Sequence, residues 1–278
     1  MMKSYNYQLV NVFAESHFGG NPLAVFTDAD NLTDEQMQLI ARQFNLSECV
    51  FFQTATDKSA VRKLRIFTPG CELPFAGHPT IGSAFVLHTL LNLGDDYMLE
   101  TQSGLVEIHH QNDVITLALK NGVKTAECTF STAQCAELLG LQESDILNAD
   151  WVNTGTNQLL IRVNSESAVE NCKISAALFN QILPNRSVYV WFTANNQAKV
   201  RLFFQANGII AEDPGTGSAA ANLGGWCIVN GLSPIDWTIN QGDEIDRPNR
   251  LSLKVDENKT IFVGGKVIKV GQGELLVP

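Results

Sequence analysis

The chain nearly repeats itself at a distance close to half its length of 278 residues. Three segments recur in order: RIF (65–67) as RLF (201–203), GGNPL (19–23) as GTNQL (155–159), and HPTIGSA (78–84) as DPGTGSA (213–219). The offsets are 136, 136 and 135 residues, so one short gap aligns all three. A chain of this length suits two domains of ordinary size. The repeat therefore predicts two domains of similar fold, with a shared cleft that receives a similar element from each half.

Both halves are rich in short stretches that alternate like strands. We expect strands at 5–13, 23–26, 49–53, 60–67, 97–101, 105–109, 114–119, 159–163, 188–192, 200–204, 237–239, 251–255, 261–263 and 267–270. The last two would be joined by a hairpin turn at Gly264-Gly265-Lys266.

Helices are fewer, and two of them are apolar on nearly every side. One follows Pro79 and ends near Gly94, and the other starts near Pro214. Helices of this kind are buried. Capping boxes at Thr33 and Ser131 predict two amphipathic helices, and residues 166–183 form a further expected helix. The pattern predicts an α+β fold of two pseudo-symmetric domains, each a curved, mostly antiparallel sheet wrapped around a central apolar helix.

Composition excludes several classes of function. The net charge is −10, which argues against a nucleic-acid partner, because binding phosphates needs a basic surface. No window of ~18 apolar residues predicts a membrane span, and the start of the chain lacks a signal-peptide pattern. We therefore expect a cytoplasmic protein. The six cysteines have no metal-binding spacing, and they are expected to be reduced thiols.

The starts of the two apolar helices are the first candidate site. Gly77 and His78 lie at one, and Thr216, Gly217 and Ser218 lie at the other. Backbone N–H groups at a helix start are free, and they bind carboxylates or phosphates. Two such starts would hold one small anion from both sides. The competing interpretation is that the glycines only permit close packing and that Asp213 only caps its helix.

Glu48 is the second candidate, because large apolar residues surround it in LSECVFF (46–52). Desolvation of a carboxylate raises its pKa toward the range useful for proton transfer. The offset of the repeat places Pro184 opposite Glu48, so the second half has no equivalent acid. The alternative is a solvated glutamate at the end of a strand.

Other polar groups give weaker evidence of a functional site. Glu72 with Arg65 and Arg62 is interpreted as surface or strand-pair charges. His88, His109 and His110 have no spacing that suits a metal, so no metal and no cofactor is expected.

The chain resembles the phenazine biosynthesis-like (PhzF) isomerase family, which has the diaminopimelate epimerase-like fold. The motifs that carry the resemblance are VNVFAESHFGGNPLAVF, NLSECVFF, RIFTPGCELPFAGHPTIG, EDPGTGSAAANLG and IFVGGKVIKVGQGEL. The resemblance implies domains at 1–122 and 123–265, with the last strand, about 266–278, returning to the first domain. It also implies an active site in the cleft between the domains, and a homodimer.

The resemblance also assigns roles to residues. It implies a catalytic carboxylate at Glu48, a site histidine at His78 and a site aspartate at Asp213. Ser218 is the family's site serine, and the backbone of Gly77 and Gly217 lines its anion pocket. One departure is Asp246-Arg247-Pro248-Asn249, where the family usually has GRPS.

Together these observations predict a cofactor-independent isomerase that moves a proton on a small carboxylic acid. Glu48, His78 and Asp213 would be catalytic, and Gly77, Thr216, Gly217 and Ser218 would bind the substrate. Two alternatives stay open. One is a racemase or epimerase of an amino acid, although the two opposed cysteines that the epimerase and racemase relatives use are replaced here by Ala76 and Asp213. The other is a non-catalytic protein that binds small carboxylates.

Overall fold

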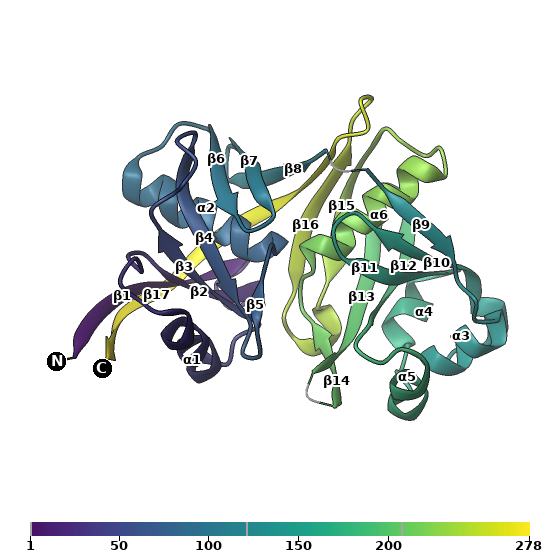
Figure 1. Ribbon diagram of the computed structural model, residues 1–278. Helices are drawn as coiled ribbons and strands as arrows, with labels where there is room; N and C mark the ends of the chain where they lie inside the picture. The colour runs from purple at the N-terminus through teal and green to yellow at the C-terminus, as the bar shows by residue number, and fades with distance from the viewer. Residues whose placement is uncertain (1, 121, 207) are drawn as a thin grey trace. The chain divides into compact units, whose positions relative to one another are not determined.

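A computed structural model describes residues 2–120, 122–206 and 208–278 (Figure 1). Asn121, at the expected join between the halves, lies outside the described residues. The chain forms two compact units: Met1–Ala118 with Gly264–Pro278, and Leu119–Val263.

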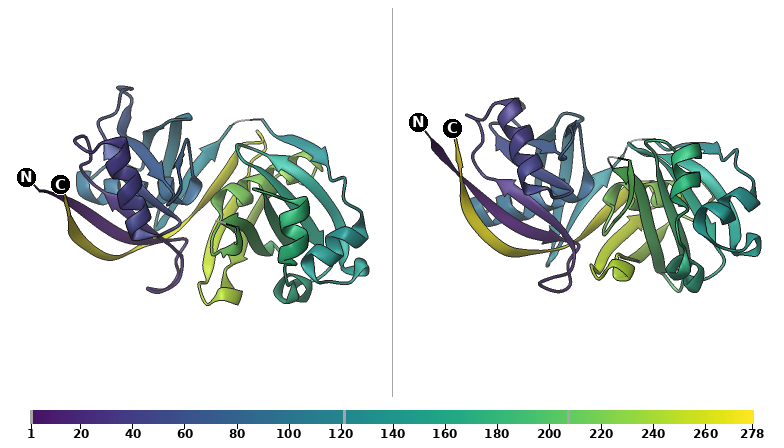
Figure 2. Two further views of the ribbon diagram at one scale, coloured as in Figure 1. Left: turned by 60° about the horizontal axis from the view of Figure 1, so that its bottom comes forward. Right: turned by 90° about the horizontal axis from the view of Figure 1, so that it is seen from below.

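The first unit contains two helices, α1 (Asp34–Phe44) and α2 (Gly77–Leu91). Its strands are β1 (Lys3–Val12), β2 (Asn21–Phe26), β3 (Glu48–Gln53), β4 (Ala60–Phe67), β5 (Glu72–Leu73), β6 (Asp96–Thr101), β7 (Gly104–Gln111) and β8 (Val114–Leu119). Most of β17 (Ile261–Val277) also belongs to this unit, where it runs antiparallel to β1. The two ends of the chain therefore lie side by side (Figure 2).

The second unit contains α3 (Thr132–Leu139), α4 (Glu166–Asn171), α5 (Ala176–Ile182) and α6 (Gly217–Val229), with 3₁₀ turns η1 (Glu143–Asp145) and η2 (Asp243–Ile245). Its strands are β9 (Lys124–Glu127), β10 (Ile146–Asn153), β11 (Asn157–Val163), β12 (Ser187–Ala194), β13 (Gln197–Ala206), β14 (Ile209–Asp213), β15 (Ile235–Gln241) and β16 (Asn249–Val255).

The two units pair their strands in the same order. In the first, β1–β2 is antiparallel, β2–β3 parallel, β3–β4 and β4–β5 antiparallel, β4–β6 parallel and β6–β7 antiparallel. In the second, the same sequence of pairings runs β10–β11, β11–β12, β12–β13, β13–β14, β13–β15 and β15–β16. The prediction of a duplicated, mostly antiparallel sheet is therefore confirmed.

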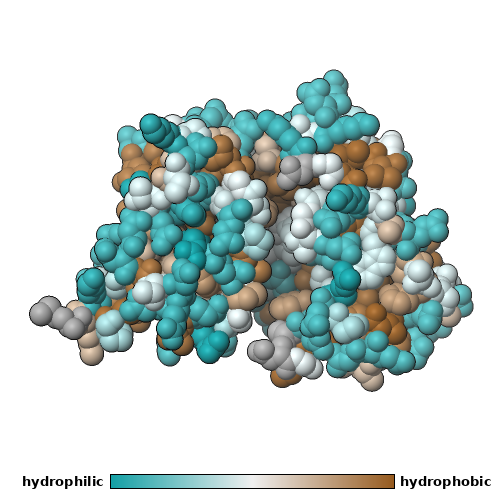
Figure 3. Space-filling model, viewed as in Figure 1, coloured by the Kyte–Doolittle hydropathy of each residue, from teal (hydrophilic) through white to brown (hydrophobic). Residues whose placement is uncertain are grey.

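The two apolar helices occupy equivalent places, α2 between β5 and β6, and α6 between β14 and β15. Ten residues of each are buried. Gly82 shows how closely α2 packs, because a Cβ there would lie 2.6 Å from Leu23 Cδ2 in β2. The buried helices expected from the sequence are confirmed. Hydrophilic side chains cover most of the surface seen in Figure 3.

The expected helix at 166–183 is wrong, because the chain breaks into α4 and α5. Lys173 N donates to Leu139 O (2.7 Å) and Ser175 N to Leu138 O (2.9 Å), both at the end of α3. Ser175 then caps α5 through Leu178 N. The backbone between the helices is held by α3, which no local pattern reveals.

The hairpin turn expected at 264–266 is also wrong, since β17 continues through it. A Cβ on Gly264 would lie 2.4 Å from Ile115 O in β8, so the glycine allows two backbones to approach closely. The strands β5, β9, β10 and β14 were not expected from the sequence.

Candidate active site in two parts

Glu48 begins β3, three residues after α1 ends at the left-handed residue Asn45. Its side chain is 15% exposed. Burial, followed by the negative charge of Glu48, raises the pKa of the neighbouring Cys49 thiol to about 12. The side chain of Glu48 is thus largely removed from water, as the apolar sequence around it predicts.

His78 faces Glu48 from the first turn of α2. Its Nε2 atom lies 3.4 Å from Glu48 Oε2, and its side chain is 7% exposed. Burial lowers the pKa of His78 to about 3, so the imidazole is neutral at ordinary pH. The contact therefore joins a carboxyl group to a neutral imidazole, an arrangement that can hold or pass one proton.

The start of α2 lies beside this pair. The N-cap is Ala76, and no side-chain hydrogen bond caps the helix. Pro79 has no N–H group, and both Thr80 N and Thr80 Oγ1 donate to Ala76 O (3.2 and 2.8 Å). Gly77 and His78 are the first two residues of the helix, where N–H groups have no partner within the helix and can bind an anion.

In the second unit, Asp213 and Thr216 form one hydrogen-bonded turn ahead of α6. Thr216 is the N-cap, and its hydroxyl donates to Asp213 Oδ2 (2.5 Å). The fully buried Gln241 holds both residues: Nε2 donates to Asp213 O (2.8 Å) and to Thr216 Oγ1 (2.9 Å), and Oε1 accepts from Thr216 N (3.1 Å). Asp213 therefore lies three residues ahead of the N-cap position of α6, and it anchors Thr216, which occupies that position.

Ser218 follows in the first turn of α6. Gln158 Nε2 donates to Ser218 Oγ (3.3 Å), while Asn222 Nδ2 donates to Gln158 Oε1 (2.8 Å). Asn222 Oδ1 in turn accepts from the backbone and hydroxyl of Thr154 (2.8 Å each). This buried polar chain orients Ser218 from the β10–β11 hairpin.

The turn ahead of α6 packs tightly against the residues around Gly242 and Asn249. A Cβ on Gly215 would lie 2.2 Å from Asn249 Oδ1, and one on Gly242 would lie 2.6 Å from Pro214 O. Asn249 is the residue that ends the unusual Asp246-Arg247-Pro248-Asn249 segment, and it is fully buried. The departure from the family pattern thus lies directly against the turn that carries Asp213.

The structure corrects how the two helix starts correspond. Glu72 lies opposite Phe67, and Glu212 lies opposite Phe203, so these two glutamates are equivalent. From there ELPFAGH (72–78) aligns with EDPGTGS (212–218) at an offset of 140 residues, because the second hairpin is four residues longer. His78 therefore matches Ser218, and not Asp213 as the sequence repeat suggests.

Glu48 also has a different counterpart. Cys49 lies opposite Phe67, as Val188 lies opposite Phe203. Cys49 and Val188 are therefore equivalent, and so are the residues before them, Glu48 and Ser187. The match of Glu48 with Pro184 that the sequence repeat suggested is wrong. The second unit still has no acid at this place.

The structure thus brings Glu48, His78 and Gly77 together in one unit, and Asp213, Thr216, Gly217 and Ser218 in the other. Sequence reasoning missed Gln241 and Gln158. The sequence did contain a signal for Gln241, because this residue lies on the buried face of an alternating strand, two residues after Ile239.

Within residues 2–120, 122–206 and 208–278, no three His, Cys, Asp or Glu side chains are grouped to hold a metal, and no helix is long and apolar enough to cross a membrane.

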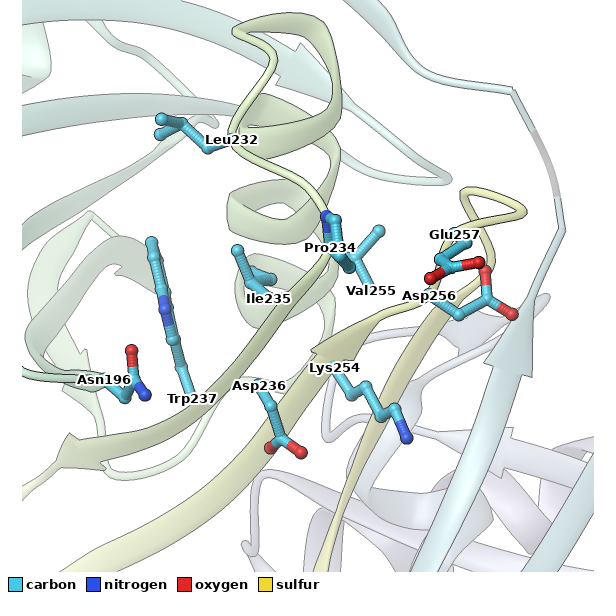
Figure 4. A pocket seen from close by; sticks show the side chains of 10 residues that line it. All are labelled: Asn196, Leu232, Pro234, Ile235, Asp236, Trp237, Lys254, Val255, Asp256 and Glu257. Carbon is cyan, nitrogen blue, oxygen red and sulfur yellow. The ribbon is translucent and has the colours of Figure 1, made fainter.

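A groove of about 700 Å³ lies elsewhere in the second unit (Figure 4). Trp237 and Pro234 form part of its wall, with Lys254, Asp256 and Glu257 at one end. None of the site residues predicted from the sequence lines it.

Comparison with known proteins shows the family and the fold. The family model described as "Phenazine biosynthesis-like protein" matches residues 10–273. An uncharacterized isomerase of Pasteurella multocida is 61% identical over all of this chain and 96% of its own length. The trans-2,3-dihydro-3-hydroxyanthranilate isomerase of Pseudomonas fluorescens is 32% identical over 98% of this chain and 100% of its own. A crystal structure of the Bacillus anthracis PhzF-family protein superposes with a TM-score of 0.87 at 25% identity, covering 99% of this chain and 100% of that one.

Proposed function

Because this chain belongs to the phenazine biosynthesis-like family, whose members include named isomerases, we propose that it moves a proton on a small carboxylic acid without a cofactor. The isomerase class follows from the family and from its relatives. The substrate and the residues that act on it are the proposal.

The observation that carries the proposal is the contact between Glu48 and the neutral His78. An ionised Glu48 would accept a proton from a carbon of the substrate, and the C–H bonding pair would move into the conjugated system of the acid. The protonated Glu48 would then return the proton to a different carbon, so that the substrate is isomerised and the enzyme is unchanged. His78 would keep the proton in reach of Glu48, because the two side chains lie 3.4 Å apart.

The helix starts would bind the substrate's carboxylate. Gly77 would contribute its N–H group at α2, and Gly217 at α6, where the hydroxyl of Ser218 is also available. The hydroxyl of Thr216 already donates to Asp213, so Thr216 would serve binding by fixing the place of the helix start. Asp213 would orient Thr216 and carry a second site for a proton. That both sets of residues serve one substrate stays a prediction from the sequence.

Trans-2,3-dihydro-3-hydroxyanthranilate is the first substrate to test, because the Pseudomonas relatives are named for its isomerisation. Glu48→Gln should lower kcat by ~10²–10⁴-fold, since this is the usual contribution of a positioned acid or base. Glu35→Gln, on the exposed side of α1, is the matched control and should keep the wild-type rate. Turnover of Glu48→Gln at the wild-type rate would exclude the proposed role.

The same experiment in deuterated water separates the alternatives. An isomerase of this kind transfers hydrogen between two carbons of this substrate, and solvent deuterium appears only at the carbon that receives the proton, to the extent that protonated Glu48 exchanges with water. A racemase would instead exchange the α-hydrogen of an amino acid, and a protein that only binds carboxylates would exchange neither. The homodimer and the cytoplasmic location stay predictions from the sequence.

A further inference from the structure

Two largely buried Arg–Glu pairs precede the helix starts, one in each unit. In the second unit, Arg201 in β13 donates through Nε and Nη2 to both carboxylate oxygens of Glu212 in β14 (2.9 and 2.7 Å). Only 11% of the Arg201 side chain and 9% of the Glu212 side chain are exposed. Two parallel charge-assisted bonds fix both the distance and the orientation of the strands they join.

The first unit contains the same pair. Arg65 in β4 donates through Nε and Nη2 to the two oxygens of Glu72 in β5. Each arginine also lies over the ring of the phenylalanine two residues later, with Cζ 5.5 Å from the Phe67 centroid and 4.8 Å from the Phe203 centroid. The sequence interpretation of Arg65 and Glu72 as strand-pair charges is thus correct, but it is incomplete.

The arginines hold a third element in each unit. Arg65 Nη2 donates to Asp34 Oδ1 (2.9 Å), at the first residue of α1. Arg201 Nη1 donates to the carbonyls of Glu170 (3.1 Å) and Cys172 (2.9 Å), at the last turn of α4. Since α1 lies between β2 and β3, and α4 lies between the equivalent strands β11 and β12, each arginine ties the short hairpin to the equivalent connection.

The glutamates stand at a fixed distance from the helix starts. Glu72 is five residues before Gly77, and Glu212 is five residues before Gly217, with a proline two residues after each glutamate. The spacing E-x-P-x-x-G is kept even though the two hairpins differ in length by four residues. The part of the hairpin that is preserved is therefore the part between the Arg–Glu pair and the helix.

We propose that Arg65–Glu72 and Arg201–Glu212 are positioning pairs, each of which sets the place of the first N–H groups of its helix, α2 or α6, for binding the substrate. This inference rests on the proposed function, because it assigns these helix starts to substrate binding. Stability alone does not account for the pairs, since a buried ion pair is often no more stabilising than apolar residues of the same size. A bidentate pair does define one geometry, and a displacement of ~1 Å at a binding group can cost ~10²-fold in rate.

Glu212→Gln and Glu72→Gln test the proposal, with Glu100→Gln as the matched control. Glu100 is also largely buried, at 12% side-chain exposure, and accepts hydrogen bonds from Thr56 and Asp57, but it lies on β6 after α2 has ended. Amide hydrogen exchange reports local opening directly. In Glu212→Gln, exchange should rise at least ~10-fold at the helix start, residues 213–220, and stay at the wild-type rate in the remainder of the unit. In Glu72→Gln, exchange should rise in the same way at residues 73–80. In Glu100→Gln, exchange should stay at the wild-type rate in both segments.

Binding gives the second readout, with 3-hydroxyanthranilate as an aromatic carboxylate probe. Its Kd should rise by ~10–100-fold in both test variants and stay unchanged in Glu100→Gln. Arg201→Lys keeps the positive charge but not the two parallel N–H donors of the guanidinium group. It should therefore bind the probe more weakly than wild type and more tightly than Arg201→Met.

Unchanged exchange at the helix starts, or an increase spread evenly over the unit, would overturn the proposal. The exchange result stands whether or not the protein isomerises any substrate, so it is decided separately from Glu48→Gln. If exchange rises locally while the probe binds as before, the pairs order the helix starts but do not serve binding, which also refutes the proposal.

Discussion

Burial of a neutral His78 makes the stability of the protein depend on pH in a defined way. The pKa of His78 is lowered by burial from 6.5 to about 3. Between these values the unfolded chain binds a proton at this residue and the folded protein does not. A state that binds more protons gains as the pH falls, so this residue lowers the stability of the fold from about pH 6.5 downward, with the loss levelling off near pH 3.

The size of the effect follows from the two pKa values. At pH 8 both states carry a neutral imidazole, and the contribution is close to zero. At pH 5 the pH lies 1.5 units below the pKa of the unfolded chain, and each unit corresponds to about 1.36 kcal/mol. Protonation of the unfolded chain therefore lowers the stability by about 2 kcal/mol. The carboxylate of Glu48 acts in the opposite direction, because a negative charge 3.4 Å from Nε2 favours the imidazolium. About 2 kcal/mol is therefore an upper value.

The measurement is urea unfolding of the wild type and of His78→Asn at pH 8 and at pH 5. The wild type should lose up to about 2 kcal/mol more between these pH values than the variant, because every other titrating group is common to both. The absolute stability of the variant does not enter, so a cavity left by the smaller side chain does not confuse the result. Equal losses in the two proteins would show that His78 is not held neutral in the fold, and the proton-sharing role with Glu48 would lose its basis.

Three further substitutions test the architecture around the site. Gly82→Ala should lower the free energy of unfolding by about 1–3 kcal/mol, since its Cβ would lie 2.6 Å from Leu23 Cδ2, and a loss below this range in urea unfolding would mean that α2 has room to shift. Gln241→Leu leaves buried groups of Thr216 unpaired, so it should cost about 1–3 kcal/mol and raise KM more than it lowers kcat; a change in kcat alone would contradict its place in substrate binding. Thr33→Ala removes the cap of α1 and should cost about 1 kcal/mol by thermal unfolding, with kcat and KM at wild-type values.

Local signals in the sequence were sufficient to predict features that depend on residues close together in the chain. Both capping boxes form as predicted, with Gln36 N donating to Thr33 Oγ1 and Gln134 N to Ser131 Oγ (3.2 Å each). The two helices with apolar residues on all sides are buried, because such a helix has no face that water can cover at low free-energy cost.

Features that depend on distant parts of the chain were not predicted. The break between α4 and α5 is held by carbonyls of α3, and the continuation of β17 depends on the close approach of β8 at Gly264. The correspondence of the helix starts failed for a related reason. HPT and DPG look alike in the sequence, but the pairing of Glu72 and Glu212 with their strands fixes a different register.

The corrected register separates what the two units share from what they do not. They share the strand order, the Arg–Glu pair, the proline and the glycine that begins the buried helix, all of which build a helix start with free N–H groups. Three of their differences concern ionisable side chains of the proposed site, and the pairs of equivalent residues are Glu48 and Ser187, His78 and Ser218, and Leu73 and Asp213. Every ionisable side chain proposed for catalysis stands at a place where the other unit has none. A duplicated framework can hold a carboxylate with either copy, but moving a proton from one carbon to another needs an acid or base on a defined side. Under the proposed function, the differences between the copies would therefore carry the chemistry, while the shared framework would bind the anion.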